Sequence, residues 1–233
     1  MRKISPDGVW QDFESQLDEQ SDHYNASWET FEDAIHRKIA TENYALAIGV
    51  MFEGFVNDLI FAYANRDCSR VMRHLEDSLK ESFRGNSKVE KAYNKFGEFK
   101  ARDHLTKDEL KDILDSEGRN TSFPTFAAIE DRASQWLADE HRNKFSNLNA
   151  QRKAIIDAVI AVRNNLAHRS KSSLDRLNDA LQAGPLHGTG LQRNVNRIQQ
   201  AGHYLKSRPN NGAETRADIL GERLKDAAHQ LVL

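Results

Sequence analysis

The chain has little cysteine, proline or glycine, and its charges nearly cancel. It holds one cysteine, four prolines and 12 glycines in 233 residues. The single thiol, Cys68, cannot form a disulfide within the chain or a cysteine-based zinc site. A net charge of −2 is unlike that of a protein that coats DNA or RNA non-specifically. Any nucleic-acid binding therefore requires a local basic patch.

Long apolar runs are also absent. The first seven residues lack the apolar core of a signal peptide, and no run of 18 apolar residues occurs anywhere. Together with the single cysteine, this predicts a cytoplasmic protein with no membrane contact. The length suits one large domain or two small ones, and we interpret residues 1–233 as a single domain.

What the sequence does contain is helical spacing. Apolar residues recur three and four positions apart almost throughout, and alternating β-branched runs are nearly absent, which predicts an all-α fold. Trp28, Phe31, Ile35 and Ile39 predict one helical stripe. The most apolar segment, 42–64, predicts the central helix of a bundle.

The middle of the chain is more polar than the rest. Residues 68–118 predict short, charged helices that form an insertion between core segments at about 40–66 and 120–205. Within the insertion, Thr106 and Glu109 form a capping-box pattern, and Gly118 is predicted to end the helix that follows. Later helices are predicted at about 122–137, 149–168, 173–183, 191–205 and 214–231.

The predicted helix 149–168 ends in a polar hexapeptide, 163–168, after an apolar run. Arg163 falls within a second apolar strip beside the main one, while Asn164 and His168, four residues apart, share a third face. An arginine can hold a phosphate, and a histidine in general can transfer a proton near neutral pH. Spacing alone is weak support, because Arg197 with His203 and Arg223 with His229 form similar pairs.

A cation within an apolar strip needs an acid or a bound anion. Glu53 stands alone inside the apolar segment 49–55 and is the natural candidate. Two interpretations stay open: a buried ion pair that only satisfies both charges, or a pair that orients the guanidinium toward a phosphate. The second strip itself predicts contact with another helix of the chain or with a second copy across a dimer axis.

The hexapeptide and the apolar segment 46–55 together resemble the Arg-x4-His signature and the acid-bearing core helix of the HEPN superfamily. The resemblance is strongest to stand-alone bacterial nucleases of the MAE-like and RiboL-PSP type. It implies a bundle of four to five core helices with a charged helical insertion and C-terminal helices. Arg163 and His168 match the motif residues, Asn164 matches the polar residue after the arginine, and Glu53 matches the family's acid.

The resemblance further implies a metal-independent endoribonuclease without a cofactor, in which a homodimer forms a composite active site on the RNA substrate. Attack by the ribose 2′-OH would leave 2′,3′-cyclic phosphate and 5′-OH ends. A role as a toxin or anti-phage defence effector, with an antitoxin or defence-system partner protein, is implied as well. Ser170 replaces the tyrosine of one large subgroup, which argues against the Tyr-modified toxin type.

Arg169 and Lys171 follow the motif and are candidates for gripping the RNA backbone, or are an ordinary solvated loop. Two alternatives to the nuclease remain. One is a non-catalytic HEPN-like module for dimerisation, nucleotide sensing or partner binding, which the acidic net charge favours. The other is a helical protein whose hexapeptide is an ordinary helix end. Metal-ligand spacings and the Gly-x-Ser-x-Gly turn of hydrolases are absent from the sequence.

Overall fold

The computed structural model describes residues 3–114, 122–209 and 212–233. Every regular element in these ranges is helical, and no strand occurs in them, so the predicted all-α class is confirmed. The elements are listed in chain order: α1 (Pro6–Thr30), α2 (Ala34–Arg66), α3 (Ser69–Ser82), α4 (Ser87–Phe96), α5 (Lys107–Leu114), α6 (Phe126–Trp136), α7 (Asp139–Ser146), α8 (Ala150–His168), α9 (Lys171–Ala180), the 3-10 turn η1 (Gly184–Leu186), α10 (Ala201–Lys206) and α11 (Arg216–His229).

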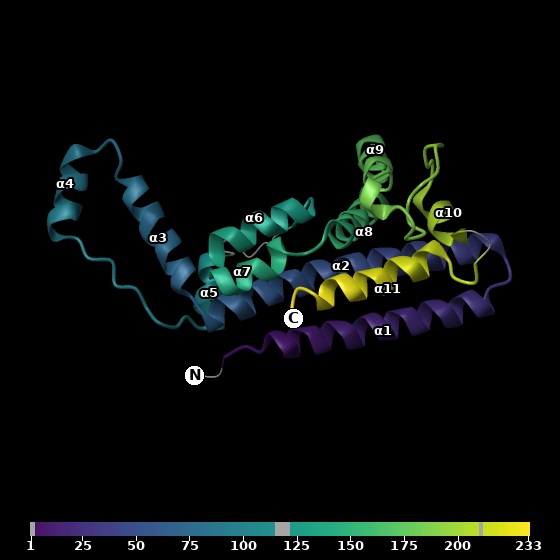
Figure 1. Ribbon diagram of the computed structural model, residues 1–233, viewed down its shortest axis with the longest axis horizontal. Helices are drawn as coiled ribbons and strands as arrows, with labels where there is room; N and C mark the ends of the chain where they lie inside the picture. The colour runs from purple at the N-terminus through teal and green to yellow at the C-terminus, as the bar shows by residue number, and fades with distance from the viewer. Residues whose placement is uncertain (1–2, 115–121, 210–211) are drawn as a thin grey trace.

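The long helix α2 is the axis of the molecule (Figure 1). It contacts α1, α5, α6, α8, α10 and α11, and its buried side chains include Ile48, Phe52 and Leu59. By length and composition α2 is also apolar enough to cross a membrane, although half of its most apolar window is buried inside the protein. A helix apolar on several sides is typical of the centre of a bundle.

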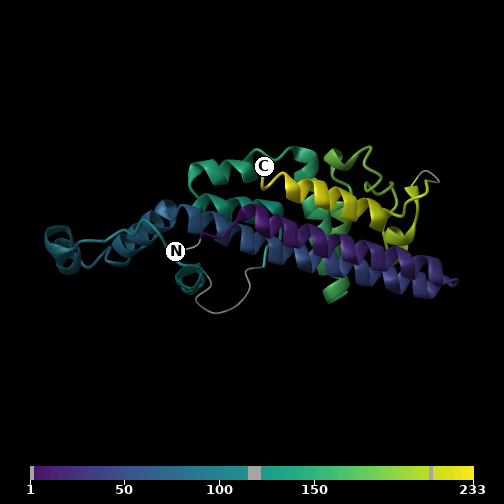
Figure 2. The ribbon, with the colours of Figure 1, turned by 90° about the horizontal axis from the view of Figure 1, so that it is seen from below.

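The core extends beyond the segments predicted for it. α1 runs along α2 and buries Trp10, Phe13 and Leu17, and α11 packs against α1, α2 and α8 (Figures 1 and 2). Both helices lie outside the predicted core ranges, 40–66 and 120–205.

The predicted single stripe from Trp28 to Ile39 is wrong, because the helix breaks inside it. α1 ends at Thr30, and the Asp33 carboxylate accepts hydrogen bonds from the backbone N–H groups of Ile35 and His36, which starts α2. Ile35 and Ile39 are consequently 71% and 47% exposed.

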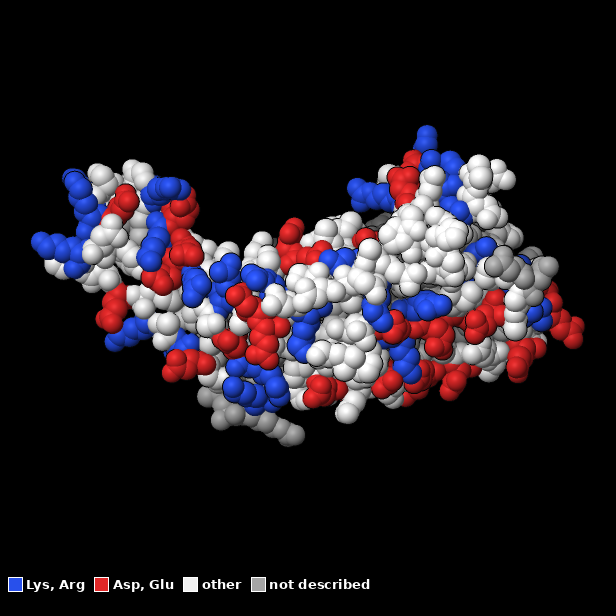
Figure 3. Space-filling view, viewed as in Figure 1, with Lys and Arg blue, Asp and Glu red and all other residues white. Residues whose placement is uncertain are grey.

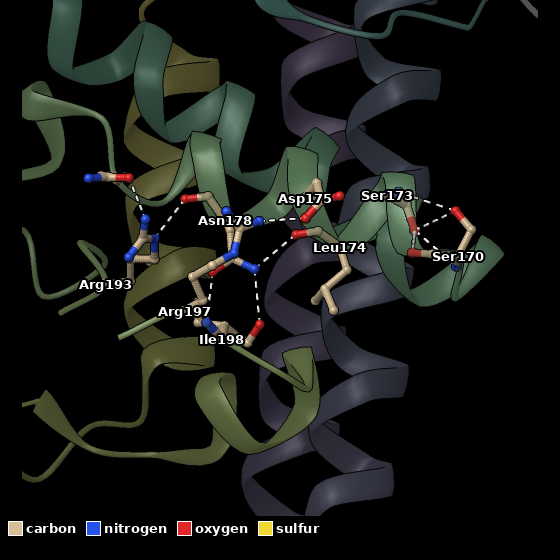
Figure 4. A network of polar contacts seen from close by, with 9 residues as sticks. Ser170, Ser173, Leu174, Asp175, Asn178, Arg193, Arg197 and Ile198 are labelled. Carbon is tan, nitrogen blue, oxygen red and sulfur yellow. Dashed lines mark hydrogen bonds and ion pairs between the residues drawn. The ribbon is translucent and has the colours of Figure 1, made fainter. Parts of the chain in front are cut away.

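The predicted helix 191–205 is also wrong, apart from α10 at its end. Side chains from α9 and the segment itself replace the helical hydrogen bonds there (Figure 4). The Asn178 amide pairs with both the N–H and the carbonyl of Ile198, and the Arg193 guanidinium donates to the carbonyls of Asn178, Asn194 and Val195. Backbone groups paired in this way have no need of a helix.

The predicted insertion has two parts in the structure. α3 and α4 form an arm that projects from the end of α2 (Figures 1 and 2), whereas α5 returns to the body and buries Leu110. The predicted capping box is present: the Thr106 N–H donates to the Glu109 carboxylate, and the Glu109 N–H to the Thr106 hydroxyl. Gly118 lies outside the described residues.

His141, on α7, is expected to make the stability of the helical bundle depend on pH. Its ring stacks on Tyr63 with 4.4 Å between centroids, and its Nδ1 is buried without a hydrogen-bond partner among the described residues. Burial lowers the pKa of His141 below the ordinary histidine value near 6.5. As the pH falls through the ordinary histidine pKa, the unfolded chain binds a proton at His141 more readily than the folded protein does. The contribution of His141 to the free energy of unfolding is therefore present above this pH and is lost below it.

We therefore expect His141→Phe, which keeps the ring stack, to flatten the fall in unfolding free energy between neutral and mildly acid pH. Urea unfolding at a series of pH values measures this. His187 is exposed, so His187→Phe is the control and should leave the slope unchanged. An unchanged slope in His141→Phe would contradict the assignment.

Candidate active site

The motif helix forms where it was predicted. α8 spans Ala150–His168, and the Asn149 side chain caps it by accepting from the Arg152 N–H. Ile155, Ile156, Val159 and Val162 are buried against the core. α8 therefore holds its C-terminal polar residues on a rigid element.

Arg163 and Glu53 meet, as their isolation in apolar surroundings predicted. The Arg163 Nη2 donates to the Glu53 Oε2 at 2.6 Å, with the side chains 24% and 19% exposed. The pair joins α8 to α2 within one chain, so this part of the second apolar strip faces a helix of the same molecule. Gly49 permits the close approach: a Cβ there would lie 2.6 Å from the Arg163 Cβ.

Asn164 holds the same guanidinium from the side of α8 that carries His168. The Arg163 Nη1 donates to the Asn164 Oδ1 at 2.8 Å, while Asn164 and His168 lie one turn apart on the same side of α8. The guanidinium is thus held at two points, by a carboxylate on α2 and by an amide beside the histidine. A planar fork held at two points has a fixed orientation.

Arg163, Asn164 and His168 line one open groove of about 830 Å³ between α8, α9 and the residues before α6. The His168 side chain is exposed and makes no hydrogen bond with the described residues. The remaining lining residues are Ser122, Pro124, Thr125, Asp157, Ala161, Ser170, Ser172, Ser173, Arg176, Asp179 and Ala180. Three of the four predicted catalytic residues therefore share a groove, and Glu53 stands behind Arg163.

The wall of the groove depends on a sharp turn between α8 and α9. Arg169 adopts a left-handed backbone with φ of 48°, the only positive φ of a non-glycine residue in the described ranges, and its N–H donates to the Asn165 carbonyl at 2.8 Å. Ser170 then caps α9 in a capping box with Ser173, whose hydroxyl accepts from the Asn165 amide. Asn165, the second amide of the hexapeptide, is buried and structural.

This turn moves Arg169 and Lys171 out of the groove. The Arg169 guanidinium donates to Glu42 on α2 at 3.4 Å, and both basic residues line a separate hollow of about 430 Å³ beside α10. Ser170 lines both spaces. The two predicted RNA-binding residues thus adjoin the candidate site without facing His168.

Arg176 is the cation that the sequence interpretation missed. Ser172, Arg176 and Asp179 lie on one face of α9 at helical spacing, and all three line the groove. Ser170 could have been recognised as an N-cap, which would have started the predicted helix at 171 and not at 173. Ser172 and Arg176 would then have fallen on one face of that helix. Across the groove, Asp157 accepts a hydrogen bond from the Phe126 N–H at 2.6 Å, and burial raises the pKa of its carboxyl.

Comparison with known proteins adds no assignment, since no family model, curated protein or solved structure matches the chain. In the described ranges, no group of three or more His, Cys, Asp or Glu side chains is placed to hold a metal ion.

Proposed function

We propose that the protein is an endoribonuclease that cuts RNA in the groove between α8 and α9 by attack of the ribose 2′-OH. The proposal is supported most by a guanidinium held at two points and, at the same groove, an imidazole that makes no hydrogen bond with the described residues. Glu53 and Asn164 hold Arg163, and His168 stands one turn beyond Asn164 at the same open groove. A phosphate-binding fork beside a proton-transfer group suits phosphodiester cleavage.

In the proposed reaction, a phosphodiester lies with its non-bridging oxygens toward Arg163. The 2′-oxygen loses its proton to an imidazole and attacks the phosphorus, and the bond to the 5′-oxygen breaks. That oxygen takes up a proton, which leaves a 2′,3′-cyclic phosphate and a 5′-OH end. The N–H groups of Arg163 that are not engaged by Glu53 and Asn164 offset the charge that develops on the phosphate.

The charge distribution supports approach of RNA from the groove side. α1 carries seven acidic residues and no lysine or arginine, and it lies along the edge of the molecule opposite α8 and α9 (Figures 1 and 3). The groove is mixed in charge, with Arg163 and Arg176 beside Asp157 and Asp179, and Arg169 and Lys171 lie at its margin near Glu42. A polyanion is therefore repelled more strongly by α1 than by the groove side.

A homodimer with a composite site is part of the proposal. The cleavage needs one group to remove a proton and another to donate one, and two copies of His168 would supply both. α2 offers apolar side chains for such a contact. Val50, 50% exposed, lies one turn before Glu53 on the same side of the helix, and Ile39, 47% exposed, lies further along that side.

The test is incubation of the purified protein with RNA, with and without EDTA, followed by analysis of the product ends. We expect cleavage that EDTA leaves unchanged, with cyclic phosphate at the 3′ ends. Intact RNA would instead favour a binding module of the same fold. Strong inhibition by EDTA would contradict the metal-independent reaction.

A further inference from the structure

The arm formed by α3 and α4 has an exposed surface that takes no part in the candidate active site. α4 lies at the outer end of the arm, away from the bundle (Figures 1 and 2), and none of its residues is buried. The base of the arm is fixed to the body: the Arg70 Nε donates to the Ser134 carbonyl, and His74 packs edge-on against Trp136 at 4.6 Å. The arm therefore presents α4 on a supported stem.

α4 carries a row of lysines in a chain that is acidic overall. Residues 83–100 contain five lysines or arginines and two glutamates, a net charge of +3, whereas the whole chain has −2. Lys88, Lys91 and Lys95 are spaced three and four apart and so share one side of α4. This stretch is a local basic patch of the kind that nucleic-acid binding requires here.

These lysines differ from two cations at the end of α3, which form ion pairs with acids of that helix. Lys80 pairs with Glu76 at 2.6 Å, and Arg84 just beyond the helix pairs with Glu81 at 2.8 Å. In the described part of the chain, no acidic side chain forms an ion pair with any of the three lysines of α4. Unpaired exposed lysines attract phosphate groups without first losing an internal partner.

An exposed aromatic ring lies beside the lysine row. Phe96 is 79% exposed, and the Lys95 Nζ lies 5.2 Å from its ring centroid. Tyr93 is already engaged, because its ring packs on Phe83 at 5.3 Å. An exposed aromatic ring next to a row of cations is the combination that binds single-stranded nucleic acid, since bases stack on the ring while phosphates follow the charges.

We propose that α4 is a second RNA-binding surface, with Lys88, Lys91 and Lys95 on phosphates and Phe96 stacked on a base. The choice of RNA over DNA rests on the proposed nuclease function. The arm and the α8–α9 end of the body stand apart on either side of a broad hollow (Figure 3). Only an RNA long enough to cross that hollow reaches both surfaces, so the substrate class is a long RNA with a single-stranded stretch.

The test measures binding of a long, fluorescently labelled poly-U RNA to the full chain carrying His168→Ala, so that the RNA stays intact. Adding Lys88→Ala, Lys91→Ala and Lys95→Ala should weaken binding about tenfold or more and lower the salt-dependence slope by about 2. Phe96→Ala should weaken it about fivefold or more, and Phe96→Trp should not.

The matched control replaces three exposed cations elsewhere: Lys107→Ala, Lys111→Ala and Arg223→Ala. It makes the same charge change and should leave most of the affinity and the slope in place. Unchanged RNA binding by the α4 variants would overturn the proposal. If RNA affinity is unchanged but sedimentation shows a changed oligomeric state, the proposal is also overturned. The lysines would then be assigned to contact with an acidic protein surface, such as α1 of a second copy.

The outcome can be separated from that of the nuclease proposal. If the parent protein cuts no RNA but the α4 variants lose RNA binding, the nuclease proposal fails and the arm proposal stands. If the parent cuts RNA and the α4 variants, with His168 restored, bind and cut long RNA equally well, the arm proposal alone fails. When both hold, the α4 variants cut a dinucleotide at the parent rate and a long RNA more slowly.

Discussion

Replacing His168 with alanine is expected to slow RNA cleavage by about 10²- to 10⁴-fold, the usual contribution of a positioned general acid or base. The side chain is exposed and makes no hydrogen bond with the described residues, so its removal should leave the unfolding temperature nearly unchanged. Cleavage of a labelled RNA under single-turnover conditions, together with a thermal melt, measures both effects.

The chain supplies a matched control for this experiment. His203 is exposed on α10 and follows Arg197 at a spacing similar to that of the motif. His203→Ala should cut RNA at the parent rate. Equal rates for the parent and His168→Ala would remove His168 from the site. Equal losses in both variants would show that the effect is not specific to the groove.

Replacing Arg163 with alanine is expected to lower the cleavage rate by about 10²- to 10³-fold, as for other removed donors that stabilise developing negative charge. Arg163→Lys should recover little of it. A lysine ammonium is a point charge and cannot bridge Glu53 and Asn164 while presenting further N–H groups to a phosphate. The rates are compared at saturating RNA, so that weaker binding does not hide the effect on the chemical step.

Arg163→Ala should also destabilise the fold, by about 1–3 kcal/mol, because Glu53 is left mostly buried without its partner. Combining it with Glu53→Gln should recover part of this stability without recovering cleavage. Recovered cleavage in the double variant would mean that the pair only satisfies its own charges. Arg197→Ala, which breaks the half-exposed pair with Asp175, is the control for loss of a surface ion pair and should cost little.

The parts of the fold that could be predicted are those set by a physical requirement that the sequence itself shows. The bounds of α8 follow from its apolar spacing. The Glu53–Arg163 contact follows from the cost of two lone charges in apolar segments, although they are far apart in the chain. In both cases a single strong physical requirement acted on residues that the sequence shows directly.

Other parts depended on contacts that the sequence does not show. The irregular segment 191–200 is held by the side chains of Asn178 and Arg193, whose partners follow only from the folded chain (Figure 4). Likewise, the left-handed turn at Arg169 decides which basic residues face the groove. It turns Arg169 itself toward Glu42 and leaves Arg176 on the groove wall.

The most direct test of the central claim replaces one hydroxyl of the substrate. An oligonucleotide with a single 2′-deoxy nucleotide at a mapped cleavage position is incubated with the protein in EDTA, and the products are identified by mass spectrometry. We predict that cleavage is lost at that position alone, while every other cut leaves a 2′,3′-cyclic phosphate. Continued cleavage at the 2′-deoxy position would contradict attack by the 2′-OH and the roles proposed for Arg163 and His168.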